Sequence, residues 1–321
     1  MSISDASRAH LPLGPGAEFD IVRSLLARWG NAAEGVGDDA AVLVVPRGQQ
    51  LVVSTDTSLE NVHFRRAWLS PDEIGYRAGA AALSDLAAMA AEPLGMTVAI
   101  TLPESWRADL EVLADGLAEV ANRAGSPILG GDLTRGRDLA ITITVLGTSA
   151  APLTRNGART GDVVWVTGTL GGSRLALRAL ERGAIPAEAH RQRFARPSPR
   201  LREARWLQAN GASAGIDCSD GLAADLAHLA AASRAHVVLA LDRVPCANGA
   251  SMEDAAQSGE EYELIVTAPA TLDVTAFEAA FGLPLTAIGR VTSTGAERAE
   301  VRATHHGAVV ALPAGHDHFA G

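Results

Sequence analysis

The sequence contains no lysine, and all 27 of its Lys/Arg-type basic side chains are arginine. This absence excludes several protein classes that depend on a lysine ammonium group. Walker-A triphosphatases and protein-kinase-like enzymes place a lysine on the nucleotide phosphates. Schiff-base and pyridoxal enzymes use a lysine as their nucleophile. The protein belongs to none of these classes.

Cysteine, aromatic residues and long apolar runs are also scarce. The two cysteines, Cys218 and Cys246, form no Cys-x-x-Cys pair, which favours reduced structural thiols over a zinc site or a disulfide framework. Aromatic residues make up 4% of the chain, so the core must depend on Ala, Leu and Val. The longest uncharged run, residues 139–154, is too short and too polar to span a bilayer. Because the first residues carry no secretory signal pattern, we expect a cytoplasmic protein without a membrane partner.

The charge balance is acidic, with 37 acidic against 27 basic side chains and a formal net charge of −10. A nucleic-acid-binding protein needs a cationic face, so we expect no nucleic-acid partner.

Length and periodicity predict two α/β domains. A chain of 321 residues corresponds to about two domains of ~150 residues each. Turn-forming residues are concentrated over 148–160, so we predict an N-terminal domain over 1–148 and a C-terminal domain over 149–321. Short apolar runs alternate with helical patterns in both halves, as in an α/β fold.

The expected elements follow from this pattern. Ser70, Pro71 and Glu73 form a capping-box start for an alanine-rich helix whose small residues would let neighbouring backbones approach closely. In the first half we expect helices over 21–29, 71–91 and 105–124, a hairpin over 41–45 and 51–54, and strands over 96–102 and 138–147. In the second half we expect strands over 163–167, 237–241 and 264–267 and one ending at Asp217, with helices over 172–182, 199–209 and 222–233.

Acidic residues recur at predicted strand ends and tight turns. The segments are 37–39 (GDD), 54–57 (STDT), 130–132 (GGD), 217–221 (DCSDG) and 258–263 (SGEEYE), and Asp85 lies inside the alanine-rich helix. A carboxylate in an apolar stretch is costly unless it is paired or bound to a metal. Mg²⁺ takes such oxygens together with substrate phosphates. Taken together, the segments indicate a Mg²⁺-dependent enzyme acting on phosphates.

Each feature alone has a simpler interpretation. Aspartate favours helix N-caps and turns, so any one of these segments could be structural. His63 could be a structural or exposed histidine, and Arg155 could either hold a phosphate or be a surface residue. We assign no metal to the histidines of 316–318, and we interpret Cys218 as a packing residue.

Read in order, the acidic segments and their neighbours resemble the thiamine-monophosphate kinase family, within the aminoimidazole-ribonucleotide-synthetase-like (AIR-synthetase-like) ATP-binding superfamily. The segments are GVGDDAAVL (35–43), STDTSLENVHF (54–64), LSDLAAMAAEPLGMTVAITLP (83–103), GGDLTRG (130–136), LTRNGARTGDVVWVTGTLGGS (153–173), IDCSDGLAADLAHL (216–229), SGEEYEL (258–264) and GHDHF (315–319). The similarity covers about residues 18–321. It implies a two-domain α/β (α+β) fold, with an N-terminal mixed sheet and helices that pair with a twin in a homodimer barrel, and a C-terminal α/β domain.

The resemblance also implies a reaction and its site. The reaction is Mg²⁺-dependent transfer of the ATP γ-phosphate to thiamine monophosphate by direct in-line attack, giving thiamine diphosphate and ADP. Ligands of several Mg²⁺ ions would be Asp39, Ser54, Thr55, Asp56, Asp85, Asp132, Asp217 and Asp220, of which Asp39, Asp85, Asp217 and Asp220 are the expected catalytic residues; Asp38 is a further candidate. ATP would contact Gly131, Asp132, Arg155 and Ser219, and thiamine monophosphate would contact His63, Glu260 and Phe319.

This chemistry is physically reasonable. The acceptor is a phosphate monoester with a second pKa of ~6, so it is mostly a dianion at neutral pH and needs no general base. The main obstacle is repulsion between two anions, which bridging Mg²⁺ ions would offset.

Four residues depart from the family pattern. The family usually has GGEDYEL where this chain has Ser258 and Glu261, and GGDTT where it has Leu133. Glu60 adds a negative charge near His63. These departures bear on affinity more than on the class of reaction.

Two other interpretations stay open. The first is another ATP-dependent enzyme of the superfamily, such as a ribonucleotide cyclase, a selenophosphate synthetase or a hydrogenase nitrile-maturation enzyme. The last two are expected to carry reactive cysteines, near the N-terminus or in the C-terminal tail, which this chain lacks. The second is a non-catalytic acidic metal-binding protein, although no DxDxDG calcium loop is present.

Overall fold

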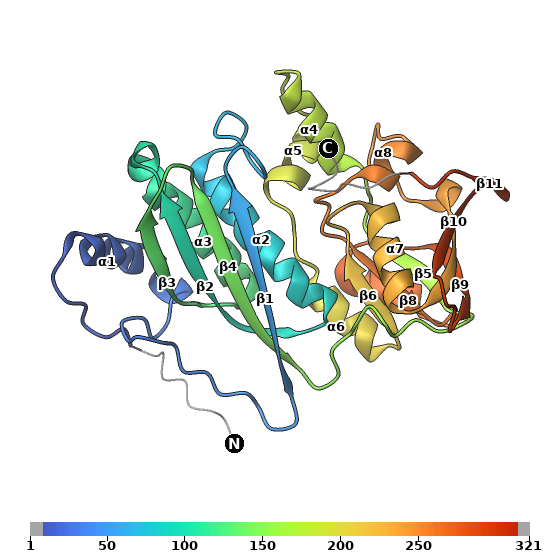
Figure 1. Cartoon of the computed structure of the whole chain (residues 1–321), viewed down its shortest axis with the longest axis horizontal. Helices are drawn as coiled ribbons and strands as arrows, with labels where there is room; N and C mark the ends of the chain where they lie inside the picture. Colours follow the sequence, from blue (N-terminus) through green and yellow to red (C-terminus); the bar gives the residue numbers. More distant parts are fainter. Residues whose placement is uncertain (1–8, 314–321) are drawn as a thin grey trace. The chain divides into compact units, whose positions relative to one another are not determined.

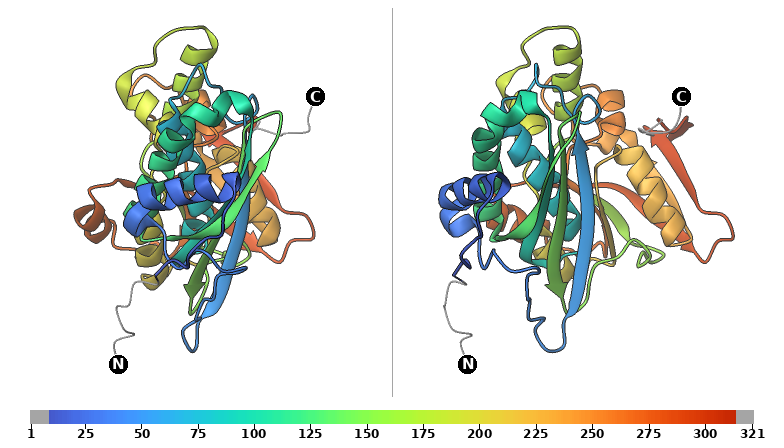
Figure 2. Two further views of the ribbon diagram at one scale, coloured as in Figure 1. Left: turned by 90° about the vertical axis from the view of Figure 1, so that its left-hand side faces the viewer. Right: turned by 60° about the vertical axis from the view of Figure 1, so that its left-hand side comes forward.

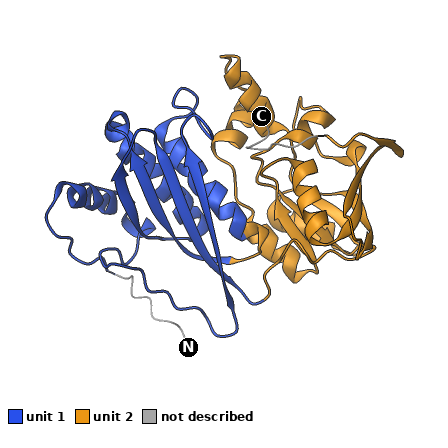
Figure 3. Cartoon of the chain, in the orientation of Figure 1, with its two compact units in different colours: residues 1–86, 92–150 blue, residues 87–91, 151–321 orange. Residues whose placement is uncertain are grey.

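The computed structural model describes residues 9–313, and the chain divides into two compact units (Figure 3). Unit 1 contains Met1–Leu86 and Glu92–Ala150, and unit 2 contains Ala87–Ala91 and Ala151–Gly321. Within the described residues, no helix combines the length and the apolar character needed to span a membrane.

Unit 1 is built on a four-stranded mixed sheet in the order β1-β4-β2-β3 (Figure 1). The strands are β1 (Gln50–Leu59), β2 (Glu92–Leu102), β3 (Ile128–Arg135) and β4 (Ala140–Ser149). β4 pairs antiparallel with β1 and β2, whereas β3 runs parallel to β2. Alternate residues of β2 and β4, including Val98, Ile100, Ile141 and Ile143, are buried. This period of two gives the sheet one apolar face.

Helices cover that apolar face of the sheet (Figure 2). The helical segments are α1 (Ala17–Trp29), the 3₁₀ turn η1 (Gly30–Ala32), α2 (Pro71–Ala88), the 3₁₀ segment η2 (Glu104–Asp109) and α3 (Leu110–Ala124). The backbone N–H of Ser70 donates to Glu73 Oε2 at 2.9 Å, as expected at the start of α2. A Cβ atom on Gly116 of α3 would collide with the carbonyl oxygen of Asp72, so the backbones of α2 and α3 touch, as the small residues predicted.

Unit 2 contains a seven-stranded, mostly antiparallel sheet in the order β11-β10-β7-β9-β5-β8-β6. The strands are β5 (Val163–Thr167), β6 (Ala214–Asp217), β7 (Ala235–Ala240), β8 (Leu264–Ala268), β9 (Leu285–Thr294), β10 (Glu300–His305) and β11 (Ala308–Val310). The helical segments are α4 (Gly172–Glu181), α5 (Glu188–Ala195), α6 (Leu201–Ala209), α7 (Leu222–Ala232), η3 (Leu241–Arg243), α8 (Met252–Gln257) and α9 (Val274–Phe281).

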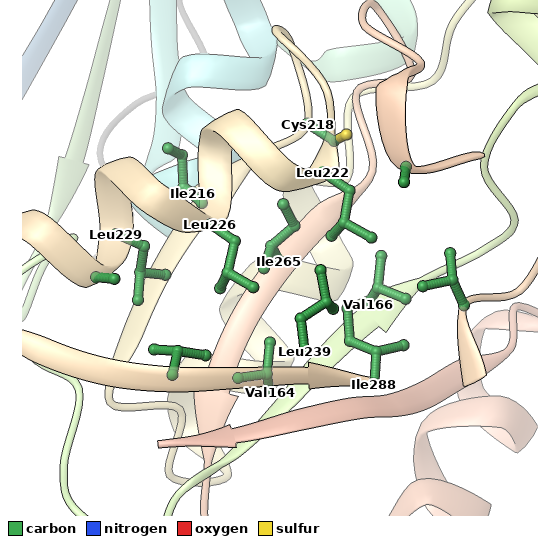
Figure 4. Close-up of a cluster of buried hydrophobic side chains, with 14 of the residues drawn as sticks. Val164, Val166, Ile216, Cys218, Leu222, Leu226, Leu229, Leu239, Ile265 and Ile288 are labelled. Atoms are coloured by element: carbon green, nitrogen blue, oxygen red, sulfur yellow. The ribbon is translucent and has the colours of Figure 1, made fainter. Parts of the chain in front are cut away.

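The core of unit 2 lies between α7 and this sheet (Figure 4). Leu222, Leu226 and Leu229 of α7, at helical spacing, pack against aliphatic residues of the strands such as Val166 and Ile265. Cys218 belongs to the same buried cluster, as its interpretation as a packing residue predicted.

The two-domain AIR-synthetase-like α/β fold class is confirmed, but several local predictions were wrong. No strand forms over 41–45, so there is no hairpin there; β1 pairs instead with β4. Residues 54–57 and 130–132 lie within β1 and β3 rather than at strand ends or turns. The helix expected over 105–124 begins as the 3₁₀ segment η2. In each case a pairing partner distant in sequence, or a tertiary contact, overrides the local pattern.

Candidate functional site

The largest group of candidate residues in unit 2 lies on the loop between β6 and α7. Asp217 is the last residue of β6 and is 4% exposed, whereas Ser219 and Asp220 on the loop are half-buried. Strand β6 pairs with β8 so that Asp217 lies opposite Leu264. This pairing brings the loop 217–221 beside the segment 258–263, which precedes β8.

Backbone hydrogen bonds join these two segments directly. Glu260 N–H donates to the carbonyl oxygen of Ser219 at 2.8 Å, and Tyr262 N–H donates to that of Cys218 at 2.9 Å. Glu260 and Tyr262 both have positive φ, 56° and 53°, a conformation that costs energy for residues with a side chain. Strained backbone that its surroundings hold in place is typical of functional sites.

Asp225, on the first turns of α7, holds the loop 217–221 from the other side. Its Oδ2 atom accepts hydrogen bonds from the N–H groups of Ser219 (3.1 Å), Asp220 (3.1 Å) and Gly221 (3.0 Å). Burial raises the pKa of Asp225 to about 8, the negative charges of Asp217 and Asp220 add to the increase, and these hydrogen bonds partly oppose it. The carboxylates of Asp217, Asp220 and Asp225 therefore lie close enough together for the first two to raise the pKa of the third.

Two buried glutamates fix the segment 258–263. Glu263 is fully buried and forms ion pairs with Arg193 and Arg200, each with a closest distance of 2.6 Å, and Thr167 Oγ1 donates to it at 2.6 Å. Burial alone would raise the pKa of Glu263, but the two arginines and the hydrogen bonds outweigh burial and hold it below its ordinary value. Glu261 also pairs with Arg193, at 3.0 Å, yet burial is dominant there and raises its pKa.

Glu261 also occupies a glycine-rich turn. Its Oε1 atom accepts hydrogen bonds from the N–H groups of Gly171 (2.8 Å) and Ser173 (3.0 Å), which precede and open α4. A glycine-rich turn between a strand and a helix is a common phosphate-binding arrangement. In this protein a buried carboxylate already occupies those two N–H groups.

In unit 1, Ser54 of β1 and Asp85 of α2 are in direct contact. Ser54 Oγ donates a hydrogen bond of 2.5 Å to Asp85 Oδ2. Asp56 lies two residues further along β1 and therefore points to the same, helix-covered face of the sheet. These three oxygen-bearing side chains form the second candidate group.

Thr55 and Asp132 lie on the opposite, open face of the sheet. Thr55 is exposed and shares a 2.9 Å hydrogen bond with Thr144 on β4. Asp132 is paired in register with Ala99 on β2, so it points away from the buried face that contains Val98. The side chains of Thr55 and Asp132 cannot reach the ion that Ser54 and Asp85 would hold. Thr55 could contribute only its carbonyl oxygen there.

The remaining predicted site residues are separate from both groups or lie outside the described residues. Asp39 is exposed in a bend beside Asp38, Gly131 is on the edge strand β3, and Arg155 is exposed in a turn. His63 follows β1, and its Nδ1 atom accepts from the N–H of Leu59 at 3.0 Å. Phe319 falls among residues 314–321, beyond the described range.

Glu60 has a structural role in unit 1. Its Oε2 atom accepts a hydrogen bond of 2.9 Å from Nε1 of Trp106. The departure at residue 60 therefore supports the buried Trp106 rather than adding a charge directed at a substrate.

The oxygen-bearing side chains of the two candidate groups can supply only part of the coordination shell of a Mg²⁺ ion. Within residues 9–313, no three His, Cys, Asp or Glu side chains are arranged to hold an ion by themselves. Mg²⁺ is usually bound through one or two carboxylates, several waters and substrate phosphates rather than by a complete protein cage. The pairs Ser54–Asp85 and Asp217–Asp220 match that incomplete coordination, and the negative charges of Asp217 and Asp220 both add to the raised pKa of Asp225.

Sequence reasoning named the acidic segment 258–263 but assigned no role to Glu261 or Glu263, and it missed Asp225 as a determinant of the site. The signal for Asp225 was a single acid within the apolar run LAADLAHL, where a carboxylate needs a partner. The partners of Glu263 are Arg193 and Arg200, far away in sequence, so spacing could not reveal them.

Comparison with known proteins identifies the family of this chain. Residues 37–149 match the N-terminal domain of AIR synthase related proteins, and residues 159–302 match the C-terminal domain. The thiamine-monophosphate kinase of Salmonella typhimurium is 38% identical over 294 residues, covering 86% of this chain and 88% of that protein.

The chain also superposes on solved structures of thiamine-monophosphate kinases. Thiamine-monophosphate kinase from Stenotrophomonas maltophilia superposes with a TM-score of 0.79 at 34% identity, covering 93% of this chain and 98% of that chain. AaThiL complexed with AMPPCP and TMP superposes with a TM-score of 0.74 at 29% identity, covering 94% of this chain and 96% of that chain. The chain therefore belongs to the thiamine-monophosphate kinase family, within the AIR synthase related proteins.

Proposed function

We propose that this protein transfers the γ-phosphate of ATP to thiamine monophosphate, giving thiamine diphosphate and ADP. The observation that carries the proposal is the contact between the loop 217–221 and the strained segment 258–263, which places Asp217, Ser219, Asp220 and Glu260 in one region. Family membership supports it, as does a similar chain that binds AMPPCP and TMP.

The proposed roles follow from the two groups. Asp217 and Asp220 in unit 2, and Ser54, Asp56 and Asp85 in unit 1, would hold several Mg²⁺ ions. When bound, these ions supply positive charge that offsets the repulsion between the two phosphate groups. We assign Asp39, Thr55 and Asp132 as further ligands from other positions in the fold, consistent with more than one ion.

The protein's own groups would bind and orient the two substrates. Gly131, Asp132, Arg155 and Ser219 are proposed for ATP, and His63, Glu260 and Phe319 for thiamine monophosphate. His63 accepts a backbone hydrogen bond through Nδ1, so in its neutral form the ring carries its hydrogen on Nε2. The acceptor phosphate attacks directly, so no phosphoenzyme forms.

We also propose two domains, 1–148 and 149–321, and a homodimer. The division of the structure at Ala150 and Ala151 supports the domain boundary. The open face of the unit 1 sheet supports the dimer, because Leu51 and Val53 on that face are 47% and 52% exposed. Light scattering of the purified protein would test the dimer.

A cytoplasmic location completes the proposal. It is supported by Cys218 and Cys246, neither of which is in a disulfide.

The first experiment is to incubate the purified protein with Mg·ATP and thiamine monophosphate and to separate the products by chromatography. We expect ADP and thiamine diphosphate in equal amounts. ATP left intact would contradict the proposal and lead to the acceptors of the sister enzymes. ADP without thiamine diphosphate would retain the nucleotide site and overturn the acceptor.

A further inference from the structure

Asp225 has an unusual set of backbone partners. A single oxygen, Oδ2, accepts from three successive N–H groups, those of Ser219, Asp220 and Gly221, and the residue is 2% exposed. All three donors precede Leu222, the first residue of α7. The side chain thus reaches back from the helix to the loop, instead of capping the helix's own first N–H groups.

The loop is also held through its carbonyl oxygens. The carbonyl of Cys218 accepts from the N–H groups of Glu261 (3.1 Å) and Tyr262 (2.9 Å), and that of Ser219 accepts from Glu260. Asp225 binds the N–H side of the loop and the segment 260–262 binds its C=O side. With both sides of the backbone fixed, the directions of the Cα–Cβ bonds of Ser219 and Asp220 are fixed too.

We infer that Asp225 is a positioning residue of the proposed metal site, which holds the loop 217–221 in the geometry in which Asp217 and Asp220 can bind a divalent cation. The inference rests on the proposed function, which assigns Asp217 and Asp220 as ligands. Residues that orient metal ligands typically change metal affinity by about 10–100-fold when they are mutated.

Two variants separate the geometry of Asp225 from its charge. Asp225→Asn keeps a carbonyl oxygen that can accept the same three N–H groups, whereas Asp225→Ala removes the acceptor. Asp254→Ala is the matched control in the same unit. Asp254 is also a buried aspartate, 8% exposed, but its carboxylate accepts from Ser251 N–H and Oγ to cap α8 and pairs with Arg174 and Arg178 instead of binding the N–H groups of the loop 217–221. Its loss should lower stability without affecting the metal site.

The experiment measures Mn²⁺ binding by electron paramagnetic resonance and amide hydrogen exchange of residues 216–224 by mass spectrometry, both on the full-length protein without nucleotide. We expect Asp225→Ala to weaken Mn²⁺ binding at least about tenfold and to accelerate exchange at 219–221. Asp225→Asn should stay within about threefold of the wild type with slow exchange, and Asp254→Ala should bind Mn²⁺ normally.

The outcomes are distinguishable. Wild-type protein that binds no Mn²⁺ even after AMPPCP is added, so that phosphates can complete the coordination, would contradict the metal site of the proposed function. Wild-type binding with unchanged affinity and exchange in Asp225→Ala would overturn this inference alone. Equal loss of affinity in Asp225→Ala and Asp254→Ala would also overturn it, because general destabilisation would then explain both.

Discussion

Ser258 Oγ donates a hydrogen bond of 2.6 Å to Oε1 of Glu261, and these are two of the residues at which the sequence departs from the pattern that the family resemblance implies. The two departures are therefore in contact. The longer side chain of glutamate reaches the N–H groups of Gly171 and Ser173, and the added hydroxyl of Ser258 supplies a further donor to the same oxygen. Ser258 also accepts from the N–H of Arg174 at 3.1 Å, which links it to α4.

This contact predicts that the two positions are energetically coupled. Ser258→Gly should cost about 1–3 kcal/mol, because it removes a donor from a buried carboxylate. Glu261→Asp should also destabilise, whereas the double variant should lose at least about 0.5 kcal/mol less than the sum of the single losses. Urea unfolding of the four proteins measures the cycle. Strict additivity would show that the two departures are independent.

The hydrogen bond between Ser54 and Asp85 predicts a selective effect on turnover. Asp85→Asn preserves the shape of the side chain but weakens its interaction with a cation, so we expect kcat to fall by roughly 10²-fold with thermal stability largely kept. Ser54→Ala should cost about tenfold. Steady-state kinetics and thermal unfolding would measure both.

Ser58→Ala is the control for this pair, since Ser58 lies on the same face of β1 but outside the predicted site. It should retain wild-type turnover. If Ser54→Ala and Ser58→Ala behave alike, the contact with Asp85 has no role in the reaction.

The buried network of Glu263 predicts a large and pH-dependent loss of stability. Glu263→Gln removes the buried carboxylate that Arg193 and Arg200 share and leaves Arg193 only Glu261 and Arg200 only Glu203, which should cost about 3–5 kcal/mol at pH 7. The folded-state pKa of Glu263 lies below its ordinary value of 4.5. Its contribution to stability is therefore present above about pH 4.5 and is lost as the pH falls through the folded-state value.

Urea unfolding at pH 7 and at progressively lower pH would show the difference between wild type and Glu263→Gln shrinking. Glu300→Gln provides the comparison, because Glu300 pairs with Arg302 at 3.4 Å in an exposed ion pair. It should change stability little at any pH. A constant difference between Glu263→Gln and wild type across the pH range would contradict the assignment.

Cys218 should be chemically inert in the folded protein. It is fully buried, and burial together with the nearby carboxylates raises the pKa of its thiol well above the ordinary value. Treatment with iodoacetamide at pH 8, followed by peptide mass spectrometry, should label the half-buried Cys246 slowly and Cys218 only after unfolding. Labelling of native Cys218 would show that the loop 217–221 opens readily.

Local pattern predicted much of unit 2. The elements β5, α4, α6 and α7 form within a few residues of their expected bounds, because each has an apolar period and a clear start or stop. Unit 1 was harder to predict. Strand β3 contains Gly130 and Gly131, which disfavour strands, and it forms through parallel pairing with β2.

The candidate site was likewise only partly predictable, because contacts between distant residues are not visible in the local sequence. The acidic segments could be found in the sequence, but which of them meet could not. Asp217 comes next to the segment 258–263 only because β6 pairs with β8 in one register. The opposite directions of Ser54 and Thr55 likewise follow from strand alternation, which became visible once residues 54–57 were known to lie inside β1.

The division of the chain between the two units bears on how it folds during synthesis. Residues 87–91 belong to unit 2 although residues 92–150 return to unit 1, and the carbonyl oxygen of Met89 accepts from the N–H of Leu153 at 3.0 Å. This short stretch leaves the ribosome before its partners in unit 2 have been translated. A fragment that starts at residue 151 would lack it altogether. When the two halves are expressed from separate genes, the second half should therefore fold only if residues 87–91 are supplied to it in addition to residues 151–321.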